Sequence, residues 1–268
     1  MNLIHSANAG RSRLFLLAPA GAYIPETFGG VEYQPYQHQM ILEGVQRLRG
    51  RVYFEDGAVD RCELEPDGRY VQAADLQAWH LVTLNGRGDV SGCARYVAHC
   101  GRLRFADTGV SSCPLGESQK WSRDFRRAVE SEINLANRLG VDYVEVGGWA
   151  LAPELRCTSE ALRIALGMFS MARLLGGCIG LTTATERHGS SSILRRIGGQ
   201  RLMTNGNEMP RYYDPRYDCQ MEILRFDSAR PNPRFEPWIE ELKHHLSTIP
   251  VIRGSVHSEL YDYRAPAA

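Results

Sequence analysis

The chain has 268 residues, 43% of them hydrophobic and 23% charged, which is typical of a globular protein with a sizeable core. Basic and acidic residues each number 31, so net charge gives no general attraction to nucleic acid or to acidic membranes. No apolar run approaches the roughly 18 residues of a membrane span, and residues 1–13 lack a signal-peptide pattern. We therefore expect a cytoplasmic protein with no membrane span and no nucleic-acid partner.

Cysteine usage supports the same expectation. The seven cysteines are odd in number, and no two of them have Cys-x-x-Cys spacing. This pattern predicts reduced thiols in an intracellular protein, several of them buried. Zinc would need clustered ligands, which the sequence does not show, so no metal site is expected.

The two ends of the chain differ from its middle. Residues 1–37 are rich in Gly, Pro, Tyr and Asn without a clear period, which predicts an extended arm that packs onto the core. Residues 229–268 are Pro-rich, with one modest helix around Trp238–Leu246 and a polar tail. We therefore predict a main domain at residues 38–228 between two extensions.

Within this domain, the first half predicts a helix and then a hairpin. Apolar residues at helical spacing begin after Gln39 and continue to Val52, which predicts a helix with one buried face. Ala78–Leu84 and Val90–Ala98 are strand-like runs on either side of a Gly-rich turn, as in a β-hairpin.

The second half predicts a strand–helix–strand unit. A helix ends at Gly140 and leads into a strand at Val141–Leu151. An almost wholly apolar helix follows, from Thr158 or Ser159 to about Leu175, and then a strand at Cys178–Thr185. A short helix and two final strands complete the pattern; they are Ser190–Ile197, Tyr212–Tyr217 and Cys219–Phe226. A parallel pair joined by a crossover helix, with hairpins beside it, makes an α/β protein with a mixed sheet.

Two adjacent glycines, Gly147 and Gly148, interrupt the strand at Val141–Leu151. Glycines inside a strand indicate a bulge or the close approach of another group. The N–H groups that a bulge leaves unpaired could hold a thioester carbonyl or the amides of a pantetheine arm. The alternative is a sheet corner without a ligand.

The start of the following helix suits a phosphate. Helix N-terminal N–H groups attract anions, and Arg156 adds a fixed charge beside the hydroxyls of Thr158 and Ser159. An ordinary capped helix is the alternative. The strand and this helix start together provide the candidate donor-binding residues, Gly148, Trp149, Leu151, Arg156, Thr158 and Ser159. Trp149 could instead be plain core.

Together these two elements resemble the GNAT acyltransferase superfamily. Its signature, Arg/Gln-x-x-Gly-x-Gly/Ala, is similar to residues 156–161, with Ser159 in place of the middle glycine. Leu194 stands where a catalytic tyrosine is often found in the superfamily. The resemblance, over residues 39–226, implies a GNAT-like fold whose central strands are bulged and splayed, with helices on both faces of the mixed sheet.

Further segments resemble two branches of that superfamily, the N-acyl amino acid synthases and the acyl-homoserine-lactone synthases. They are Leu48–Tyr53, Asp75 before Ala78–Val82, Val90–Tyr96 with Arg95, and the strand glutamate Glu145. Tyr212–Tyr217 before Met221–Leu224 is similar to the closing strands of the N-acyl amino acid synthases, which favours that branch. Where the lactone synthases carry an arginine after the glutamate, this chain has glycines, which speaks against S-adenosylmethionine as acceptor.

The resemblance implies transfer of a long fatty acyl group from acyl carrier protein or acyl-CoA to the amine of an amino acid or similar small amine. No tightly bound cofactor is implied. The alternatives are a lactone synthase and a non-catalytic module that binds acyl thioesters.

Four groups of side chains receive candidate roles. Glu145 is the candidate base for the amine, directly or through a water, or it pairs with a neighbouring arginine such as Arg95. Arg95 is a candidate acceptor-side or structural charge, and His80 is expected in the core. The apolar central helix could wall an acyl pocket. Arg187, Arg195 and Arg196 could dock an acidic carrier protein, or could form a solvated helix face.

Overall fold

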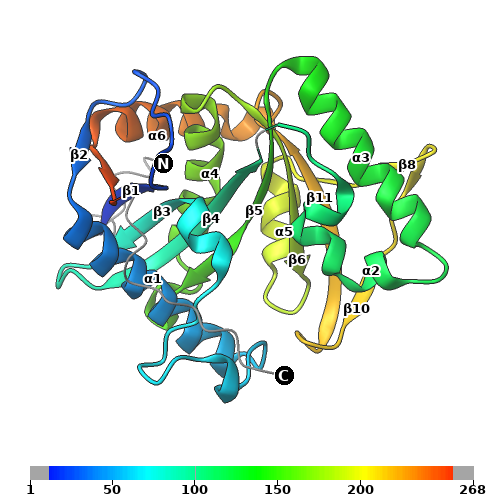
Figure 1. Cartoon of the computed structure of the whole chain (residues 1–268), viewed down its shortest axis with the longest axis horizontal. Helices are drawn as coiled ribbons and strands as arrows, with labels where there is room; N and C mark the ends of the chain where they lie inside the picture. Colours follow the sequence, from blue (N-terminus) through cyan, green and yellow to red (C-terminus); the bar gives the residue numbers. More distant parts are fainter. Residues whose placement is uncertain (1–11, 100, 256–268) are drawn as a thin grey trace.

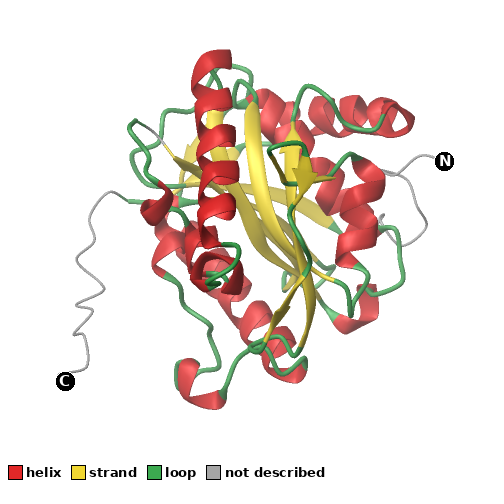
Figure 2. Cartoon of the chain, turned by 90° about the vertical axis from the view of Figure 1, so that its right-hand side faces the viewer, coloured by secondary structure: helices red, strands yellow, loops and turns green. Residues whose placement is uncertain are grey.

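The computed structural model describes residues 12–99 and 101–255, which form one large mixed sheet with helices on both of its faces (Figures 1 and 2). The sheet order is β10-β11-β6-β5-β4-β3-β1-β12-β2, and β7 also pairs with β11. In chain order, the main strands are β1 Arg13–Ala18, β2 Val31–Tyr33, β3 Trp79–Leu84, β4 Val90–His99, β5 Asp142–Leu151, β6 Cys178–Thr185, β10 Tyr212–Asp214, β11 Cys219–Asp227 and β12 Val251–Arg253. The minor strands are β7 Gln200–Arg201, β8 Met203–Thr204 and β9 Asn207–Glu208.

The α-helices of the described residues are α1 Pro35–Glu55, α2 Pro114–Glu117, α3 Ser122–Leu139, α4 Glu160–Leu174, α5 Ser190–Ile197 and α6 Glu236–Thr248. Helix α1 begins four residues before the predicted start, because Pro35 at the first helical position has its φ already fixed for a helix. Strand β10 is shorter than predicted and ends just before Pro215, which cannot donate to a strand ladder.

The pairing confirms the predicted mixed sheet. Strands β3 and β4 are an antiparallel hairpin, and β5 lies parallel to β6 with α4 as the crossover helix. The turn between β3 and β4 includes Gly88, whose φ of +88° favours glycine.

The two faces of the sheet are covered differently. Helices α1 and α3 contact β5 from one face, and they lie to the left and right of β5 in Figure 1. Helix α4 packs on β3 and β4 from the other face and is covered in turn by α6. A helix held between a sheet and another helix is apolar on most sides, which is why Ile164, Leu166 and Met171 are all fully buried.

Both terminal segments take part in these layers. The expected arm includes β1, which pairs with β3 and with β12, and helix α6 packs on α4. The division of the chain near residues 37 and 228 stays a prediction.

The central strands are bulged and splayed, as predicted. Cys93 pairs with Ala150 and Arg95 with Gly147, so a single β4 residue faces both Gly148 and Trp149. The pairing of β5 with β6 stops at residues 145 and 181, although both strands continue. The strands therefore part beyond this point and leave space between them.

The bulge requires glycine at only one of its two positions. Gly148 has φ +61°, and a Cβ there would lie 3.1 Å from Arg95 Cβ and 3.3 Å from Arg49 Nη1. A Cβ on Gly147 would have no neighbour within 4 Å. The left-handed conformation and close contacts therefore constrain Gly148 alone.

We predict that Gly148→Ala lowers the free energy of unfolding by roughly 1–2 kcal/mol, because alanine is strained in the left-handed region. Gly147→Ala is the matched control and should cost clearly less. Urea unfolding of both variants measures the difference. Equal losses would contradict this account of the bulge.

Candidate functional site

A cavity of about 390 Å³, the mouth cavity, lies where β5 and β6 separate. One wall is the bulged end of β5 from Gly147 to Leu151, and the opposite wall is β6 from Thr182 to Thr185. The end of α1, with Tyr53 and Asp56, closes a third side. The splayed pairing thus turns the centre of the sheet into a cleft.

A second space, the inner cavity, holds about 60 Å³ between the sheet and α4. Its walls are almost wholly apolar and include Tyr96, Val146, Met168, Phe169 and Phe226. The residues that line both cavities are Gly147, Trp149, Thr182 and Leu194. An apolar chamber therefore adjoins a more polar mouth at the bulge.

Four of the six predicted donor-binding residues line the mouth cavity: Gly148, Trp149, Leu151 and Arg156. Thr158 and Ser159 are absent from its lining. The Thr158 hydroxyl donates to Leu155 O at 2.7 Å and accepts from Glu160 N at 3.2 Å, while Ser159 is the N-cap residue of α4. The Thr158 hydroxyl therefore serves the helix start, whereas the Ser159 side chain makes no capping hydrogen bond.

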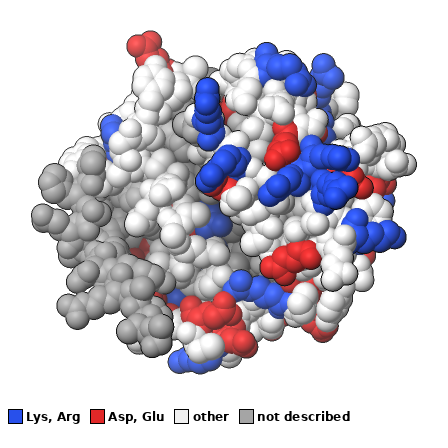
Figure 3. Space-filling view, turned by 45° about the vertical axis from the view of Figure 1, so that its right-hand side comes forward, with Lys and Arg blue, Asp and Glu red and all other residues white. Residues whose placement is uncertain are grey.

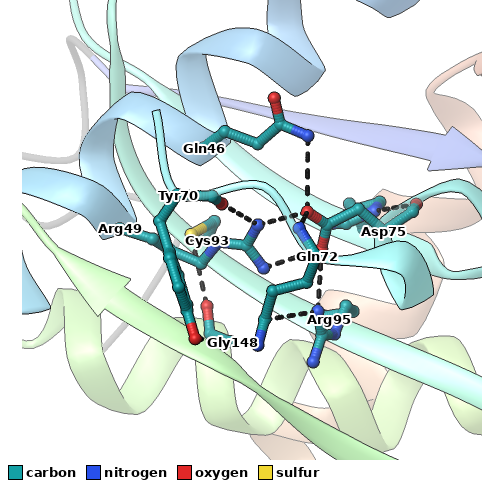
Figure 4. A network of polar contacts seen from close by, with 9 residues as sticks. Gln46, Arg49, Tyr70, Gln72, Asp75, Cys93, Arg95 and Gly148 are labelled. Carbon is teal, nitrogen blue, oxygen red and sulfur yellow. Dashed lines mark hydrogen bonds and ion pairs between the residues drawn. The ribbon is translucent and has the colours of Figure 1, made fainter. Parts of the chain in front are cut away.

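A buried polar network joins α1 to β4 beneath the bulge (Figure 4). Arg49, whose side chain is fully buried, donates to both carboxylate oxygens of Asp75 at 2.8 and 2.5 Å and to Tyr70 O at 3.1 Å. Arg95 Nη1 donates to the same carboxylate at 2.7 Å and to Gln72 Oε1 at 2.8 Å. Two guanidinium groups thus share one carboxylate, which leaves a net positive charge in the protein interior.

This environment sets the ionisation of its members. Burial alone would raise the pKa of Asp75, but the hydrogen bonds and charge of Arg49, joined by Arg95, outweigh burial and lower that pKa to about 2. His80 Nε2 donates to the backbone oxygen of Asp75 at 2.9 Å, and burial lowers the pKa of His80 to about 4. His80 is therefore a neutral core histidine, as expected.

The network also borders the bulge itself. Cys93 Sγ donates to Gly148 O at 3.4 Å, and the Tyr53 hydroxyl donates to Trp149 O at 3.4 Å. A Cβ on Gly148 would almost touch Arg49. The positive charge of the network thus lies directly behind the bulged peptide groups. The family resemblance had indicated Leu48–Tyr53, Asp75 and Arg95 separately, but not that Arg49, Asp75 and Arg95 meet in one network.

Glu145 lies on the same face of the sheet as Arg95, but it lines neither cavity. Its carboxylate accepts from His99 Nε2 at 2.9 Å and from the N–H groups of Gly109 and Val110, both at 2.7 Å. Burial would raise the pKa of Glu145, but the hydrogen bonds from His99 and from these amides lower it below its usual value. Arg95 pairs with Asp75, so the alternative pairing of Glu145 with Arg95 is wrong. His99 was not among the residues predicted from the sequence.

Two of the three candidate docking arginines form ion pairs within the described residues. Arg187 pairs with Asp218 at 3.1 Å, and Arg195 pairs with the buried Glu222 at 3.2 Å. Arg196 is exposed and has no ion pair within the described residues. Lys and Arg side chains gather with interspersed acids on the right-hand part of the face in Figure 3.

Within the described residues, no helix is long and apolar enough to cross a membrane. The six cysteines described there are free, and Cys93, Cys113 and Cys178 are buried.

Comparison with solved structures confirms the predicted resemblance at the level of the fold. The chain superposes on the CoA-dependent acyl-homoserine lactone synthase BjaI, crystallised with SAM and isopentyl-CoA, with a TM-score of 0.55. That match has 12% identity and covers 92% of this chain and 95% of BjaI. FeeM, an N-acyl amino acid synthase from uncultured soil microbes, matches with a TM-score of 0.48 and 11% identity over 82% of this chain and 92% of FeeM. Neither a protein-family model nor a curated protein sequence matches the chain.

We predict that Asp75→Asn lowers the free energy of unfolding at neutral pH by roughly 3–5 kcal/mol, because it leaves buried guanidinium charge without its carboxylate. Asp107→Asn is the matched control, since Asp107 pairs with Arg104 at the surface and should matter little. Urea unfolding measures both. Similar losses in the two variants would contradict a special role for the buried network.

The same residue predicts a pH dependence. The pKa of Asp75 in the folded protein, about 2, lies below its ordinary 3.8, so its contribution is complete above pH 4 and is lost as pH falls from 4 to 2. This contribution is about 2 kcal/mol by linkage. Unfolding measured between pH 5 and 2 should therefore decline less steeply for Asp75→Asn than for the unsubstituted protein.

Proposed function

We propose that the protein is an N-acyltransferase that moves a fatty acyl group from a carrier-protein or CoA thioester to the amine of an amino acid or similar small amine. The observation that carries this proposal is the meeting of an apolar inner cavity with a more polar mouth cavity at the β5 bulge. A thioester has the same division, with an apolar chain on one side of its carbonyl and a polar arm on the other.

The acyl chain would enter the inner cavity, where Met168 and Phe169 of α4 and Phe226 of β11 form the walls. The thioester carbonyl would then lie at the bulge, where Gly148 and Trp149 depart from regular pairing with β4. Peptide N–H groups there, with the positive charge of Arg49 and Arg95 behind them, suit the negative charge that develops on the carbonyl oxygen.

In the reaction, the amine nitrogen attacks the thioester carbonyl carbon, the new C–N bond forms and the C–S bond breaks. The donor leaves as a thiolate, and the amine loses a proton. We propose that this proton passes through a water to the Glu145 carboxylate, which lies outside the cavity lining and which its lowered pKa keeps ionised. His99 and the two amides would fix the carboxylate in position.

The acceptor would approach from the α1 face, where Tyr53 and Tyr217 line the mouth cavity. The side chain of Arg95 is 15% exposed on this face, and the two guanidinium groups of the network exceed their one carboxylate in charge. This surplus supports an acceptor that carries a carboxylate beside its amine.

The experiment is to incubate the protein with long-chain acyl carrier protein, or with acyl-CoA, and a pool of amino acids, and to identify products by mass spectrometry. We expect an N-acyl amino acid. A lactone formed from S-adenosylmethionine would favour the lactone-synthase alternative, and binding of acyl thioester without any product would favour a non-catalytic module.

We predict that Glu145→Gln lowers kcat at least about 100-fold, the usual effect of losing a general base. Asp142→Asn, an acid-to-amide change on the same strand, is the control and should retain most activity. A pH–rate profile separates the roles: loss of a base removes the acidic limb, whereas a structural defect scales the whole profile. An unchanged kcat would exclude Glu145 as the base.

We predict that Arg196→Glu lowers kcat/KM several-fold with acyl carrier protein and leaves it unchanged with acyl-CoA, because steering acts on the acidic carrier. The effect should shrink at high salt. Arg87→Glu, at an exposed arginine in the β3–β4 turn, is the control. An equal loss with both donors would contradict docking at this arginine.

A further inference from the structure

Three ionisable residues meet at the rim of the mouth cavity, and each comes from a different part of the chain. Asp56 is the C-cap residue of α1, Arg156 precedes α4, and His188 lies between β6 and α5. Asp56 Oδ1 lies 3.6 Å from Arg156 Nη2, and its Oδ2 lies 3.7 Å from His188 Nε2. The Asp56 carboxylate therefore lies between two basic side chains, Arg156 from the segment after β5 and His188 from the segment after β6.

These contacts are weak. The side chains are 42% exposed for Arg156, 46% for His188 and 21% for Asp56, and both distances exceed those of a hydrogen bond. Exposed pairs of this kind contribute at most about 1 kcal/mol. Within the described residues, neither Arg156 nor His188 has another acidic partner. A stronger anion could therefore displace the carboxylate.

The position fits a phosphate. Arg156 leads into the start of α4 and His188 into the start of α5, and both line the same cavity as the bulge. A guanidinium group and an imidazole that converge from two walls can hold a phosphate oxygen each. The pantetheine arm of a thioester donor ends in a phosphate on the side away from the thioester.

We propose that Asp56 competes with the donor: its carboxylate occupies Arg156 and His188 until the donor phosphate replaces it. This inference rests on the proposed function, because it concerns the donor of the same site. Asp56 thereby lowers the affinity for every phosphorylated donor, and it has no such effect on a ligand without a phosphate.

The test is calorimetric binding to the full chain, without acyl group or acceptor. The ligands are 4′-phosphopantetheine, CoA, holo acyl carrier protein, and pantetheine, which lacks the phosphate. We expect Asp56→Asn to tighten binding of 4′-phosphopantetheine about 3-fold, the scale of an exposed ion pair, and to leave pantetheine unchanged. A gain with CoA or with the carrier protein identifies which donor supplies the phosphate.

Two controls isolate the contact. Glu55→Gln removes the same charge from the neighbouring exposed residue and should leave binding unchanged. Arg156→Ala and His188→Ala should each weaken binding of 4′-phosphopantetheine, and adding Asp56→Asn to the double alanine variant should give no gain. The loss of the gain in that background would tie it to these two groups.

An unchanged or weaker affinity of Asp56→Asn for 4′-phosphopantetheine would overturn the inference, and so would an equal gain for pantetheine. The proposed function fails separately. If the protein transfers acyl groups but Asp56→Asn has no effect on binding, the proposed function stands and the role of Asp56 is wrong. If Asp56→Asn tightens phosphate-dependent binding but no acyl transfer occurs, the role of Asp56 stands and the proposed function is wrong.

Discussion

The site depends on the point at which β5 and β6 cease to pair. Two parallel strands normally stay about 5 Å apart along a ladder, which leaves no room for a ligand between them. Here the pairing ends at residues 145 and 181, just before the glycine pair of β5, and the bulge against β4 begins there. Both cavities lie at this separation. The space for a ligand therefore exists because β5 and β6 lose their hydrogen bonds to each other there.

The network of Arg49, Asp75 and Arg95 explains how the sheet tolerates this interruption. It binds α1 to β4 on the side where the bulge weakens the β4–β5 ladder. Burying such charges is costly unless every partner is present, and the shared carboxylate meets that need. The surplus positive charge faces the bulge, so one arrangement both holds α1 in place and creates an electrostatic environment suited to a developing oxyanion.

Charges elsewhere in the site are held less firmly, and this contrast has a functional meaning. The Glu145 carboxylate is fixed by His99 and two backbone amides, which suits the proton acceptor proposed above. The pairs of Asp56 with Arg156 and with His188 are long and exposed, as suits groups that exchange partners when a ligand arrives. The firmly held Glu145 carboxylate thus lies outside the cavity lining, and the loosely paired Asp56 lies at the rim of the mouth cavity.

The sequence by itself determined the order of the main elements between residues 39 and 226, the β3–β4 hairpin, the parallel β5–β6 unit and the bulge, because helical spacing, turn residues and strand glycines act locally. It also indicated four residues of the mouth cavity, including Gly148 and Arg156. It did not indicate that β1, β2 and β12 extend the same sheet. Only the tertiary structure decided that Arg95 pairs with Asp75, that His99 supports Glu145, and that Asp56 reaches both Arg156 and His188. These partners lie 20 to 132 residues apart in the chain, and no local periodicity records which side chains the folding of the sheet brings together.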